Sequence, residues 1–382
     1  MFNRELLATI EKQLKHPEVI LIYGARRTGK STLLEMLKEK HSEMAIFNCE
    51  NPVVSETLQS QNIENIRLLF GNKHLIALDE AQVVQNIGAI LKLLVDHKSY
   101  SPKIIATGSS SFDLANQTGE PLTGRNVAFE LFPLAMKEII DTEGWLSYLE
   151  KLPNNLIFGT YPGIVSLPDE EKKRRLLHLS SDYLFKDIFK FEQLRNPQLL
   201  RQLLKALALQ MGSQVSVNEL ANLLRTSTVT IERYLDLLEK TFVIFRLGSY
   251  SSNLRNEIKK SRKYYFTDNG IRNAVINNFS EINGRTDVGA LWENYCVNEI
   301  RKIIAYRDRF SNLYFWRNYD GAEVDLIEER AGKLISFEFK WSGKRKPKPS
   351  KSFTEVYTSQ AHFILSPDNM QDLIQWSISD SE

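Results

Sequence analysis

Short apolar runs in the first third of the chain predict the buried strands of a parallel sheet. The runs lie at Val19–Tyr23, at residues 75–78 and within residues 103–111, and each ends in small or polar residues. Uninterrupted apolar runs are typical of strands that are covered on both faces. The segment STLLEMLKEK, residues 31–40, instead repeats leucine at helical spacing. Strand, loop and helix in this order indicate an α/β domain.

A second pattern, near the middle of the chain, predicts two short helices joined by a tight turn. Ser216 and Glu219 form an S-x-x-E capping box that opens the first helix, and the turn RTS leads to a second helix at about residues 228–240. The apolar residues of the second helix recur at steps of three and four. This is the helix-turn-helix pattern, and the segment SNLRNEIKKSRKYYF returns to a strand as the wing of a winged helix does.

The last hundred residues combine a long helix with two alternating strands. The helix is predicted in GALWENYCVNEIRKII, and the strands VDLIEE and LISFEFKW are joined by a turn at AGK. Because side chains alternate between the two faces of a strand, Glu338 and Lys340 lie on the same side of the second strand. We expect the hairpin to bring both close to Asp325 in the first strand.

Composition narrows the possible functions. The 382 residues include 49 Lys and Arg and 47 Asp and Glu, a formal net charge of +2, so overall charge gives no argument for nucleic acid. Basic residues are concentrated locally, in KKSRK at 259–263 and KRKPKPSK at 344–351. The two cysteines fit neither a disulfide framework nor a zinc site. No signal peptide or membrane-spanning stretch is predicted, so we expect a cytoplasmic protein of two or three domains with no membrane partner.

The segment GARRTGKST, after the first strand, has the chemistry of a nucleotide-binding loop. Its spacing is that of the P-loop, G-x-x-x-x-G-K-[ST], and the flanking strand and helix argue against a glycine-rich turn that binds nothing. Glycines let backbone N–H groups and the helix N-terminus face the phosphates of ATP. We expect Lys30 to lie against the β- and γ-phosphates and Ser31 to hold Mg²⁺. The predicted nucleotide-binding residues are Gly24, Ala25, Arg26, Arg27, Thr28, Gly29, Lys30, Ser31 and Thr32.

A carboxylate pair is expected to complete the nucleotide site. The segment HLIALDEAQ places Asp79 and Glu80 at the carboxyl end of a strand, which is where α/β sheets bind ligands. Asp79 would act through Mg²⁺, and Glu80 would polarise the attacking water. The third strand, KIIATGSSS, ends in small polar residues that could reach the γ-phosphate, although such residues are also ordinary in turns.

Four motifs of the first domain, in order, resemble those of one family. GARRTGKST, LDEAQ, ATGSSSFDL and LTGRNVAFELFPL resemble the AAA-type P-loop ATPases of bacteria and archaea that carry a C-terminal domain of unknown function (DUF4143-like). GTYPGIV at 159–165 and YYFTDNGIRNAV at 264–275 extend the resemblance over most of the chain. The resemblance places Ser109 at a sensor position beside the nucleotide.

Arg125, in TGR, falls where that family keeps an arginine. The resemblance implies an arginine finger that reaches the γ-phosphate of a neighbouring subunit, a role that requires a ring or at least a dimer. The alternative is an ordinary solvated surface arginine. Arg26 and Arg27 could also touch phosphate, but we expect their side chains to point outward or toward a partner.

The helix-turn-helix segment predicts contacts with DNA. The N-terminal residues of the second helix can face the major groove, and basic residues of the wing can contact phosphate. The alternative is a structural or protein-docking module. The predicted DNA-binding residues are Thr228, Thr230, Arg233, Lys259, Lys260, Arg262 and Lys263.

The C-terminal hairpin resembles the PD-(D/E)xK nuclease fold. The resemblance implies that Asp325, Glu338 and Lys340 are catalytic, and that Glu293 in the preceding helix joins Asp325 and Glu338 as a ligand of Mg²⁺. Glu323 is a further carboxylate nearby. The proline that names the motif is absent, since Val324 precedes Asp325. Two alternatives stay open: a hairpin held by an ordinary salt bridge, and an inactive nuclease domain retained for DNA binding.

These patterns predict an α/β protein with three domains. They are a P-loop AAA-type ATPase domain with a parallel sheet at 1–170, a helical linker and winged-helix domain at 171–275, and an α/β restriction-endonuclease-like domain at 276–382. We expect an ATP-hydrolysing, self-associating, DNA-binding protein, with Glu80, Lys30 and Arg125 in the ATPase reaction. The alternative is an ATP-gated DNA- or protein-binding switch whose nuclease-like domain is inactive.

Overall fold

The chain forms two compact units in the computed structural model, which describes residues 2–97, 100–109, 122–183, 196–251, 262–342 and 350–378. The first unit extends to Leu134 and includes Lys240–Phe242. The second unit begins at Ala135 and takes in most of the remaining chain. The predicted boundary at 170 therefore differs from the division in the structure, where residues 135–170 belong with the C-terminal unit.

The first unit is built on a parallel sheet with the strand order β2-β3-β4-β1-β5. The strands are β1 (Val19–Tyr23), β2 (Met44–Asn48), β3 (Leu75–Asp79), β4 (Lys103–Gly108) and β5 (Asn126–Glu130). Its helices are α1 (Leu6–Gln13), α2 (Lys30–Lys40), α3 (Pro52–Gln59), α4 (Ile63–Phe70) and α5 (Ile87–Asp96), with a 3-10 turn η1 (Ala81–Val83). The three strands predicted from apolar runs are confirmed.

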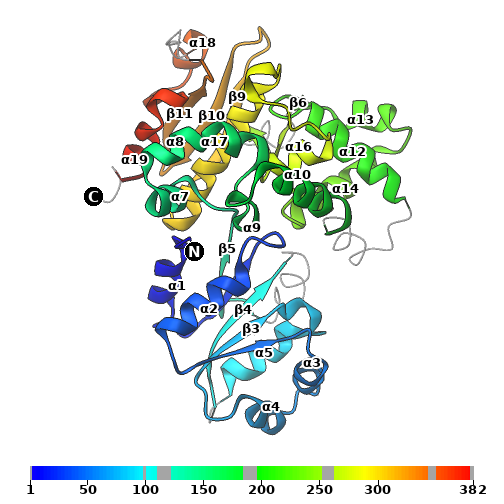
Figure 1. The fold of residues 1–382 in the computed structure, drawn as a ribbon, viewed down its shortest axis with the longest axis vertical. Coiled ribbons are helices and arrows are strands. Elements are labelled where there is room, and N and C mark those ends of the chain that lie inside the picture. Colours follow the sequence, from blue (N-terminus) through cyan, green and yellow to red (C-terminus); the bar gives the residue numbers. More distant parts are fainter. Residues whose placement is uncertain are drawn as a thin grey trace. The chain divides into compact units, whose positions relative to one another are not determined.

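Burial of the strands on both faces explains their uninterrupted apolar sequence. Leu21, Ile76, Leu78 and Ala106 lie in one core cluster together with apolar residues of α5, and Figure 1 shows these elements in the blue to cyan part of the chain. Because all the strands are parallel, their carboxyl ends lie at one edge of the sheet. The P-loop, Asp79 and the end of β4 therefore meet at this edge.

The second unit holds one mixed sheet with the strand order β12-β11-β10-β9-β7-β8-β6 in the described residues. The strands are β6 (Gln214–Val215), β7 (Ile244–Ser249), β8 (Arg262–Phe266), β9 (Asn312–Arg317), β10 (Glu323–Arg330), β11 (Lys333–Phe339) and β12 (Ser359–Leu365). The longer helices are α7 (Met136–Glu143), α8 (Trp145–Phe158), α10 (Asp169–His178), α12 (Pro197–Leu209), α14 (Thr228–Lys240), α17 (Val288–Tyr306) and α19 (Gln371–Ile378). The shorter ones are α9 (Pro162–Val165), α13 (Val217–Leu223), α16 (Asn269–Val275) and α18 (Lys351–Thr354), with a π-helical turn η2 (Leu179–Tyr183) and 3-10 turns η3 (Ile282–Gly284) and η4 (Pro367–Asn369).

The two C-terminal regions that the sequence predicts as separate domains share this sheet. β7 runs parallel to β9, with Gly248 opposite Tyr314 and Ser249 opposite Phe315. The hairpin β7–β8 is thereby joined edge to edge to the strands β9–β12. Hydrogen bonding thus crosses the predicted boundary between residues 275 and 276.

Two motifs without an assigned role, GTYPGIV and YYFTDNGIRNAV, pack on each other in the second unit. Gly159 has a φ of +71°, and a Cβ there would lie 1.9 Å from Oδ1 of Asp268. The Asp268 carboxylate accepts hydrogen bonds from the backbone N–H of Thr160 at 2.7 Å and of Ile271 at 3.2 Å. A Cβ at Gly270 would in turn lie 2.1 Å from the carbonyl oxygen of Phe158. These glycines allow the close approach of α8 to α16, so both motifs have a structural explanation.

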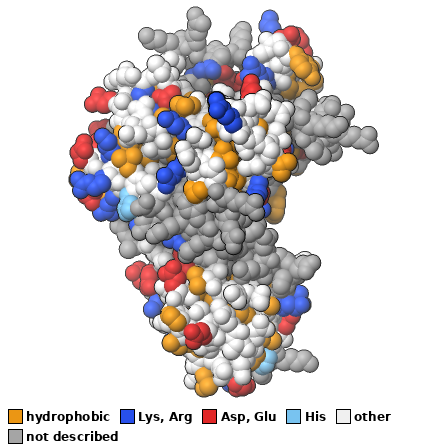
Figure 2. Space-filling view, turned by 90° about the vertical axis from the view of Figure 1, so that its right-hand side faces the viewer, with side chains coloured by type: hydrophobic (Ala, Val, Ile, Leu, Met, Phe, Trp, Pro, Cys, Tyr) orange, Lys and Arg blue, Asp and Glu red, His pale blue; other side chains and the backbone are white. Residues whose placement is uncertain are grey.

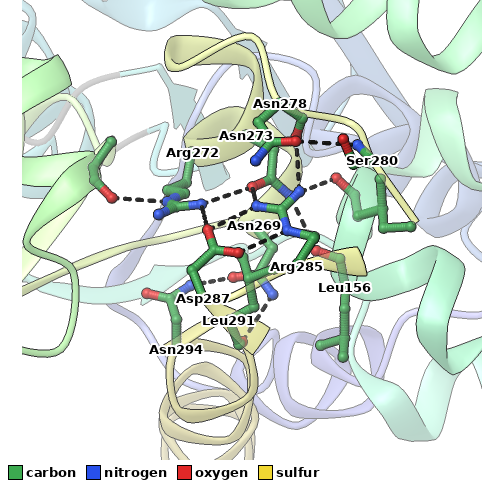
Figure 3. A network of polar contacts seen from close by, with 12 residues as sticks. Leu156, Asn269, Arg272, Asn273, Asn278, Ser280, Arg285, Asp287, Leu291 and Asn294 are labelled. Carbon is green, nitrogen blue, oxygen red and sulfur yellow. Dashed lines mark hydrogen bonds and ion pairs between the residues drawn. The ribbon is translucent and has the colours of Figure 1, made fainter. Parts of the chain in front are cut away.

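A network of charged side chains holds α16 to the start of α17 (Figure 3). Asp287 accepts from Nε and Nη2 of Arg285, both at 2.8 Å, and from Nη1 of Arg272 at 2.5 Å. The guanidinium of Arg272 also donates to the carbonyl oxygen of Ala208 at 2.9 Å. Both arginine side chains are buried, at 3% and 1% exposure. Although burial alone would raise it, hydrogen bonds from Arg285 and Arg272 lower the pKa of Asp287 to about 2.

Candidate nucleotide site and carboxylate cluster

The loop between β1 and α2 is curled by two glycines in conformations that other residues avoid. Gly24 has a φ of +155° and Gly29 a φ of +99°. A Cβ at Gly24 would lie 2.3 Å from the backbone oxygen of Leu131. Gly24 is therefore needed both for its backbone angle and for the space it leaves. Gly29 precedes the first turn of α2, so the helix N-terminus opens directly onto the loop.

Lys30 is buried inside the curl of this loop. Its Nζ donates to the carbonyl oxygens of Gly24 at 2.8 Å and Ala25 at 3.0 Å, and the residue is 4% exposed. Thr28 is also buried, and its hydroxyl donates to the oxygen of Ala25 at 2.9 Å. The ammonium thus lies among the backbone groups that the sequence predicts to surround phosphate.

Arg4 is a residue of this site that the sequence motifs do not reveal. Its guanidinium donates to the backbone oxygen of Thr28 at 2.6 Å and to that of Phe132 at 2.7 Å, and the residue is 6% exposed. It therefore braces the P-loop against the segment after β5. No pattern in the sequence marks it, because a single arginine before a helix is ordinary.

The predicted carboxylate pair lies beside the loop at the carboxyl end of β3. The Ser31 hydroxyl donates to Oδ2 of Asp79 at 2.6 Å, and the buried Thr107 hydroxyl donates to Oδ1 of Asp79. Thr107 also accepts from the backbone N–H of Glu80 at 3.1 Å. Thr107 lies within KIIATG, but its role in fixing the carboxylates was not predicted.

Glu80 is held in a strained conformation next to this bond network. Its φ and ψ of 54° and 41° lie in the left-handed region, which is unusual for a residue other than glycine. Nε2 of Gln82 donates to Oε2 of Glu80 at 2.5 Å and to the Ser109 hydroxyl at 3.2 Å. Such strain is concentrated at functional sites, because the surrounding structure must hold it in place. The site thus brings Lys30, Ser31, Asp79, Glu80 and Ser109 together.

The other predicted residues of the loop differ in exposure. Ser31, Thr32 and Arg27 are exposed, and Arg26 is half-buried. Ser31 and Asp79 present two hard oxygen donors at this open edge, a set that suits Mg²⁺.

Arg125 lies at the other end of the sheet. Its backbone oxygen accepts from the N–H of Val19, at the amino end of β1, whereas the P-loop follows the carboxyl end of that strand. Its Nε pairs with Oδ1 of Asp96 at 2.8 Å, with the arginine side chain 41% exposed. Arg125 therefore lies at the opposite end of the strands from the P-loop of its own subunit.

The predicted helical pair is confirmed as α13 and α14, and Ser216 caps the start of α13 as the sequence indicates. Ser216 accepts from the N–H of Glu219 at 3.3 Å, and Ser227 accepts from the N–H of Thr230 at 3.2 Å. Thr228 and Thr230 are half-buried, and Arg233 is exposed. Figure 2 faces the side on which Figure 1 draws these helices, and there Lys and Arg are scattered among other side chains.

The predicted wing residues have different environments. Arg262 is partly exposed and lies 4.0 Å from Oε1 of Glu232 on α14. Lys259 and Lys260 lie outside the described residues. Lys263 contradicts the prediction of a phosphate contact, because its side chain is 2% exposed and directed into the second unit. It lies on β8, where it pairs with carboxylates of α17 and β10.

The C-terminal carboxylates gather as the hairpin predicts. Asp325 lies one residue beyond the pair Leu326–Phe337 in the antiparallel register of β10 and β11, which places it opposite Glu338. Oδ2 of Asp325 accepts from the N–H of Phe339 at 2.8 Å, and Lys340 pairs with Oε1 of Glu338 at 2.6 Å.

Glu293, on α17, joins this group through Lys263. Nζ of Lys263 lies 3.1 Å from Oε1 of Glu293 and also pairs with Oε1 of Glu323. The Tyr265 hydroxyl donates to the same oxygen of Glu293 at 2.6 Å. We call Glu293, Glu323, Asp325 and Glu338 the carboxylate cluster.

Burial and mutual repulsion change the pKa values of two of these acids. Burial raises the pKa of Glu293 to about 7, although the charge of Lys263 opposes the shift. Burial and then the charge of Glu338 raise the pKa of Asp325 to about 6. Such values show that the negative charges are poorly solvated.

The nuclease resemblance implies that Glu293, Asp325 and Glu338 hold Mg²⁺, but the arrangement of these side chains does not suit such an ion. Within the described residues, no three His, Cys, Asp or Glu side chains are arranged to hold a metal. Two of the three predicted ligands are already paired with lysines, since Lys263 contacts Oε1 of Glu293 and Lys340 contacts Oε1 of Glu338.

Comparisons with known proteins agree with the first unit and leave the second without an assigned activity. An AAA domain model matches residues 16–140. Two models described as domains of unknown function, DUF8612 and DUF4143, match residues 149–282 and 288–376. The first unit is thus a parallel-sheet α/β domain of the P-loop ATPase type. The DUF8612 match runs across both predicted boundaries, at 170 and at 275.

The relatives that match along most of the chain are named uncharacterized proteins. A Mycobacterium tuberculosis protein is 26% identical over 340 residues, covering 88% of this chain and 74% of that protein. A Methanocaldococcus jannaschii protein is 28% identical over 341 residues, covering 83% and 74%. Among solved structures, a Walker-type ATPase of Pyrococcus abyssi has a TM-score of 0.48 and 18% identity, covering 72% of this chain and 96% of that one. No helix in the described part of the chain is both long and apolar enough to cross a membrane.

Proposed function

We propose that this protein hydrolyses ATP in its first unit and that nucleotide state controls DNA binding by α13 and α14. The observation that carries the ATPase proposal is the bond network of Ser31, Asp79, Thr107 and Glu80, assembled at the mouth of a P-loop. It supports both phosphate binding and activation of water, rather than binding alone.

The proposed reaction is attack of water on the γ-phosphorus of ATP, with release of ADP and phosphate. Lys30 and the N–H groups of the loop would stabilise the negative charge of the phosphates. Glu80 would accept a hydrogen bond from the attacking water, and Gln82 would keep its carboxylate turned toward Ser109. Ser31 and Asp79 would hold Mg²⁺, which when bound offsets phosphate charge.

Two substitutions separate binding from hydrolysis. Lys30→Ala should abolish ATP binding because it removes the charge inside the loop, while Glu80→Gln should bind ATP and fail to hydrolyse it. Glu35→Gln, at an exposed position of α2, is a matched control that should hydrolyse at the normal rate. Binding of a fluorescent ATP analogue and phosphate release measure the two steps. Normal turnover by Glu80→Gln would remove Glu80 from the mechanism.

DNA binding is proposed from the exposed N-terminal part of α14. Thr228, Arg233 and Arg262 are accessible for hydrogen bonds to phosphate or bases, and Lys259 and Lys260 are further candidates from the sequence. We expect binding to tolerate changes of sequence and to weaken with salt. Removing Arg233 and Arg262 together should flatten the salt slope by about one unit per lost phosphate contact.

The DNA experiment needs both a control and a nucleotide comparison. Lys151→Ala on α8 removes an exposed cation that already pairs with Glu143, so it should leave affinity unchanged. ATP hydrolysis should change when double-stranded DNA is added, and DNA affinity should differ between the ATP and ADP states. Unchanged affinity in the Arg233→Ala, Arg262→Ala double variant would favour a protein-docking role for the helical pair.

Self-association is proposed from the position of Arg125. Since this residue lies at the amino end of β1, it can serve hydrolysis only at a neighbouring subunit. Mixing Arg125→Ala with Lys30→Ala subunits should then restore part of the activity that each lacks. Absence of rescue at every mixing ratio would leave Arg125 as the surface partner of Asp96.

A further inference from the structure

The carboxylate cluster already contains a buried cation that comes from another part of the fold. Lys263 lies on β8, within the hairpin that follows α14, whereas Glu293 lies on α17 and Glu323 on β10. Nζ of Lys263 bridges these two acids, and its side chain is 2% exposed. A lysine is rarely buried to this extent unless carboxylates surround it.

The space around Glu293 is filled by groups that suit a lysine. The Tyr265 hydroxyl donates to the carboxylate oxygen that Lys263 contacts. A Cβ added to Gly212 would lie 3.3 Å from the Glu293 carboxylate. The ring of Phe315 lies 5.3 Å from Nζ of Lys263, in the range of a cation–π contact. A hydrated metal ion needs room for its waters, whereas a phenol and a backbone turn lie against Glu293 and an aromatic ring lies against Lys263.

The charges around the carboxylate cluster also argue against a bound divalent ion. The four acids of the cluster face Lys263 and Lys340, and Arg317 lies 3.8 Å from Oε2 of Glu323. Among the described residues, these three cations contact three of the four carboxylates, and none of these contacts is to Asp325. A divalent ion that used Glu293 as a ligand would compete with Lys263 for that carboxylate, and the displaced ammonium would stay buried beside a second positive charge.

We propose that Lys263 is the resident cation of the carboxylate cluster, in the place where a nuclease would hold Mg²⁺. The cluster then binds no catalytic metal and cuts no DNA. Its role is to fix the β7–β8 hairpin, and with it the helical pair, against α17 and β10. This inference is independent of ATP hydrolysis, because every residue in it belongs to the second unit.

Two variants separate the charge of Lys263 from its volume. Lys263→Met keeps most of the stem and removes the charge, and Lys263→Ala also opens a space between Glu293 and Glu323. Both should lower the thermal midpoint of the second unit by roughly 6 to 12 °C, since they leave acids buried without their cation. Only Lys263→Ala should regain stability when Mn²⁺ is added, and adding Asp325→Ala to it should reduce that gain.

Wild-type protein provides the test that requires no variant to fold. Isothermal titration with Mn²⁺ in the absence of nucleotide should give no binding at the cluster, and wild type with Mg²⁺ or Mn²⁺ should not nick plasmid DNA. Metal binding or nicking that disappears in Asp325→Ala would overturn the proposal. It would also be overturned if Lys263→Met were as stable as wild type, or if Lys263→Met responded to Mn²⁺ as strongly as Lys263→Ala.

Discussion

Replacing Asp287 with asparagine should destabilise the second unit strongly, because it removes the only carboxylate in the network drawn in Figure 3. The side chains of Arg272 and Arg285 are nearly inaccessible and both bond to Asp287. Loss of one partner from a buried ion pair costs about 3 to 5 kcal/mol, since the other charge stays buried without compensation. We expect Asp287→Asn to lower the free energy of unfolding by about that amount at pH 7.

The pKa of Asp287 gives a second, independent measure of how much its ion pairs stabilise the folded state. The fall from 3.8 to about 2 corresponds to about 2 kcal/mol of stabilisation in wild type. Because the folded pKa is the lower one, this stabilisation is complete above pH 3.8 and is lost as the pH falls toward 2. By pH 3 about 1 kcal/mol of it should be gone. Asp287→Asn cannot titrate, so this part of the acid sensitivity should vanish.

Tryptophan fluorescence in a urea titration measures the unfolding of the second unit, to which Asp287 belongs. All five tryptophans of the chain lie after Leu134, so their emission reports on the second unit alone. Asp141→Asn is the matched control, because its partner Lys137 is 40% exposed and such pairs contribute less than about 1 kcal/mol. A loss at pH 7 no larger than that of Asp141→Asn would refute the argument that this network is a buried ionic anchor.

Three further predictions test the packing and the nucleotide site. Gly159→Ala should unfold or strongly destabilise the second unit, because its Cβ would collide with Asp268, whereas Gly284→Ala, with open space around it, should cost less than about 1 kcal/mol in the same urea titration. Arg4→Met should weaken ATP binding in equilibrium titrations by about tenfold or more, since two charge-assisted bonds to the P-loop and Phe132 are lost, and unchanged affinity would show that the loop holds its shape unaided. Thr107→Val should lower the turnover number more than it raises KM, because it releases Asp79 and Glu80 without touching the loop, and a change confined to KM would contradict this.

The first unit was predictable from sequence because each of its signals is local. A buried parallel strand has an apolar run, and the P-loop has fixed spacing, so β1, β3, β4 and the site at their carboxyl ends were all expected. Arg4 and Thr107 were not expected, because their partners are backbone oxygens and a carboxylate far along the chain. Nothing in the sequence near Arg4 records that its guanidinium will meet Thr28 and Phe132.

The second unit was harder to predict because its organisation depends on pairing between distant strands. The β10–β11 hairpin was expected, and its register brings Asp325 to Glu338 as the alternation indicates. The parallel pairing of β7 with β9 joins segments on either side of residue 275, and strand alternation carries no signal for such a partner. Residues 135–170 likewise join the second unit through contacts that are distant in sequence, such as that of Gly159 with Asp268, more than a hundred residues away.

Lys263 shows that the contacts a strand provides, rather than the local density of charge, determine whether a basic side chain is buried. From composition alone, the three lysines and the arginine of KKSRK are all expected to be exposed, because each carries the same charge. Once β8 begins at Arg262, however, successive side chains point to opposite faces. Lys263 and Tyr265 then share the face that meets Glu293, while Arg262 lies near Glu232 on α14. Buried aromatic residues lie on both faces of β8, since Tyr264, Tyr265 and Phe266 are each at most 2% exposed, so alternation alone does not mark Lys263 as the buried cation. Lys263 differs from Arg262 in the acids that it meets, because its ammonium pairs with both Glu293 and Glu323.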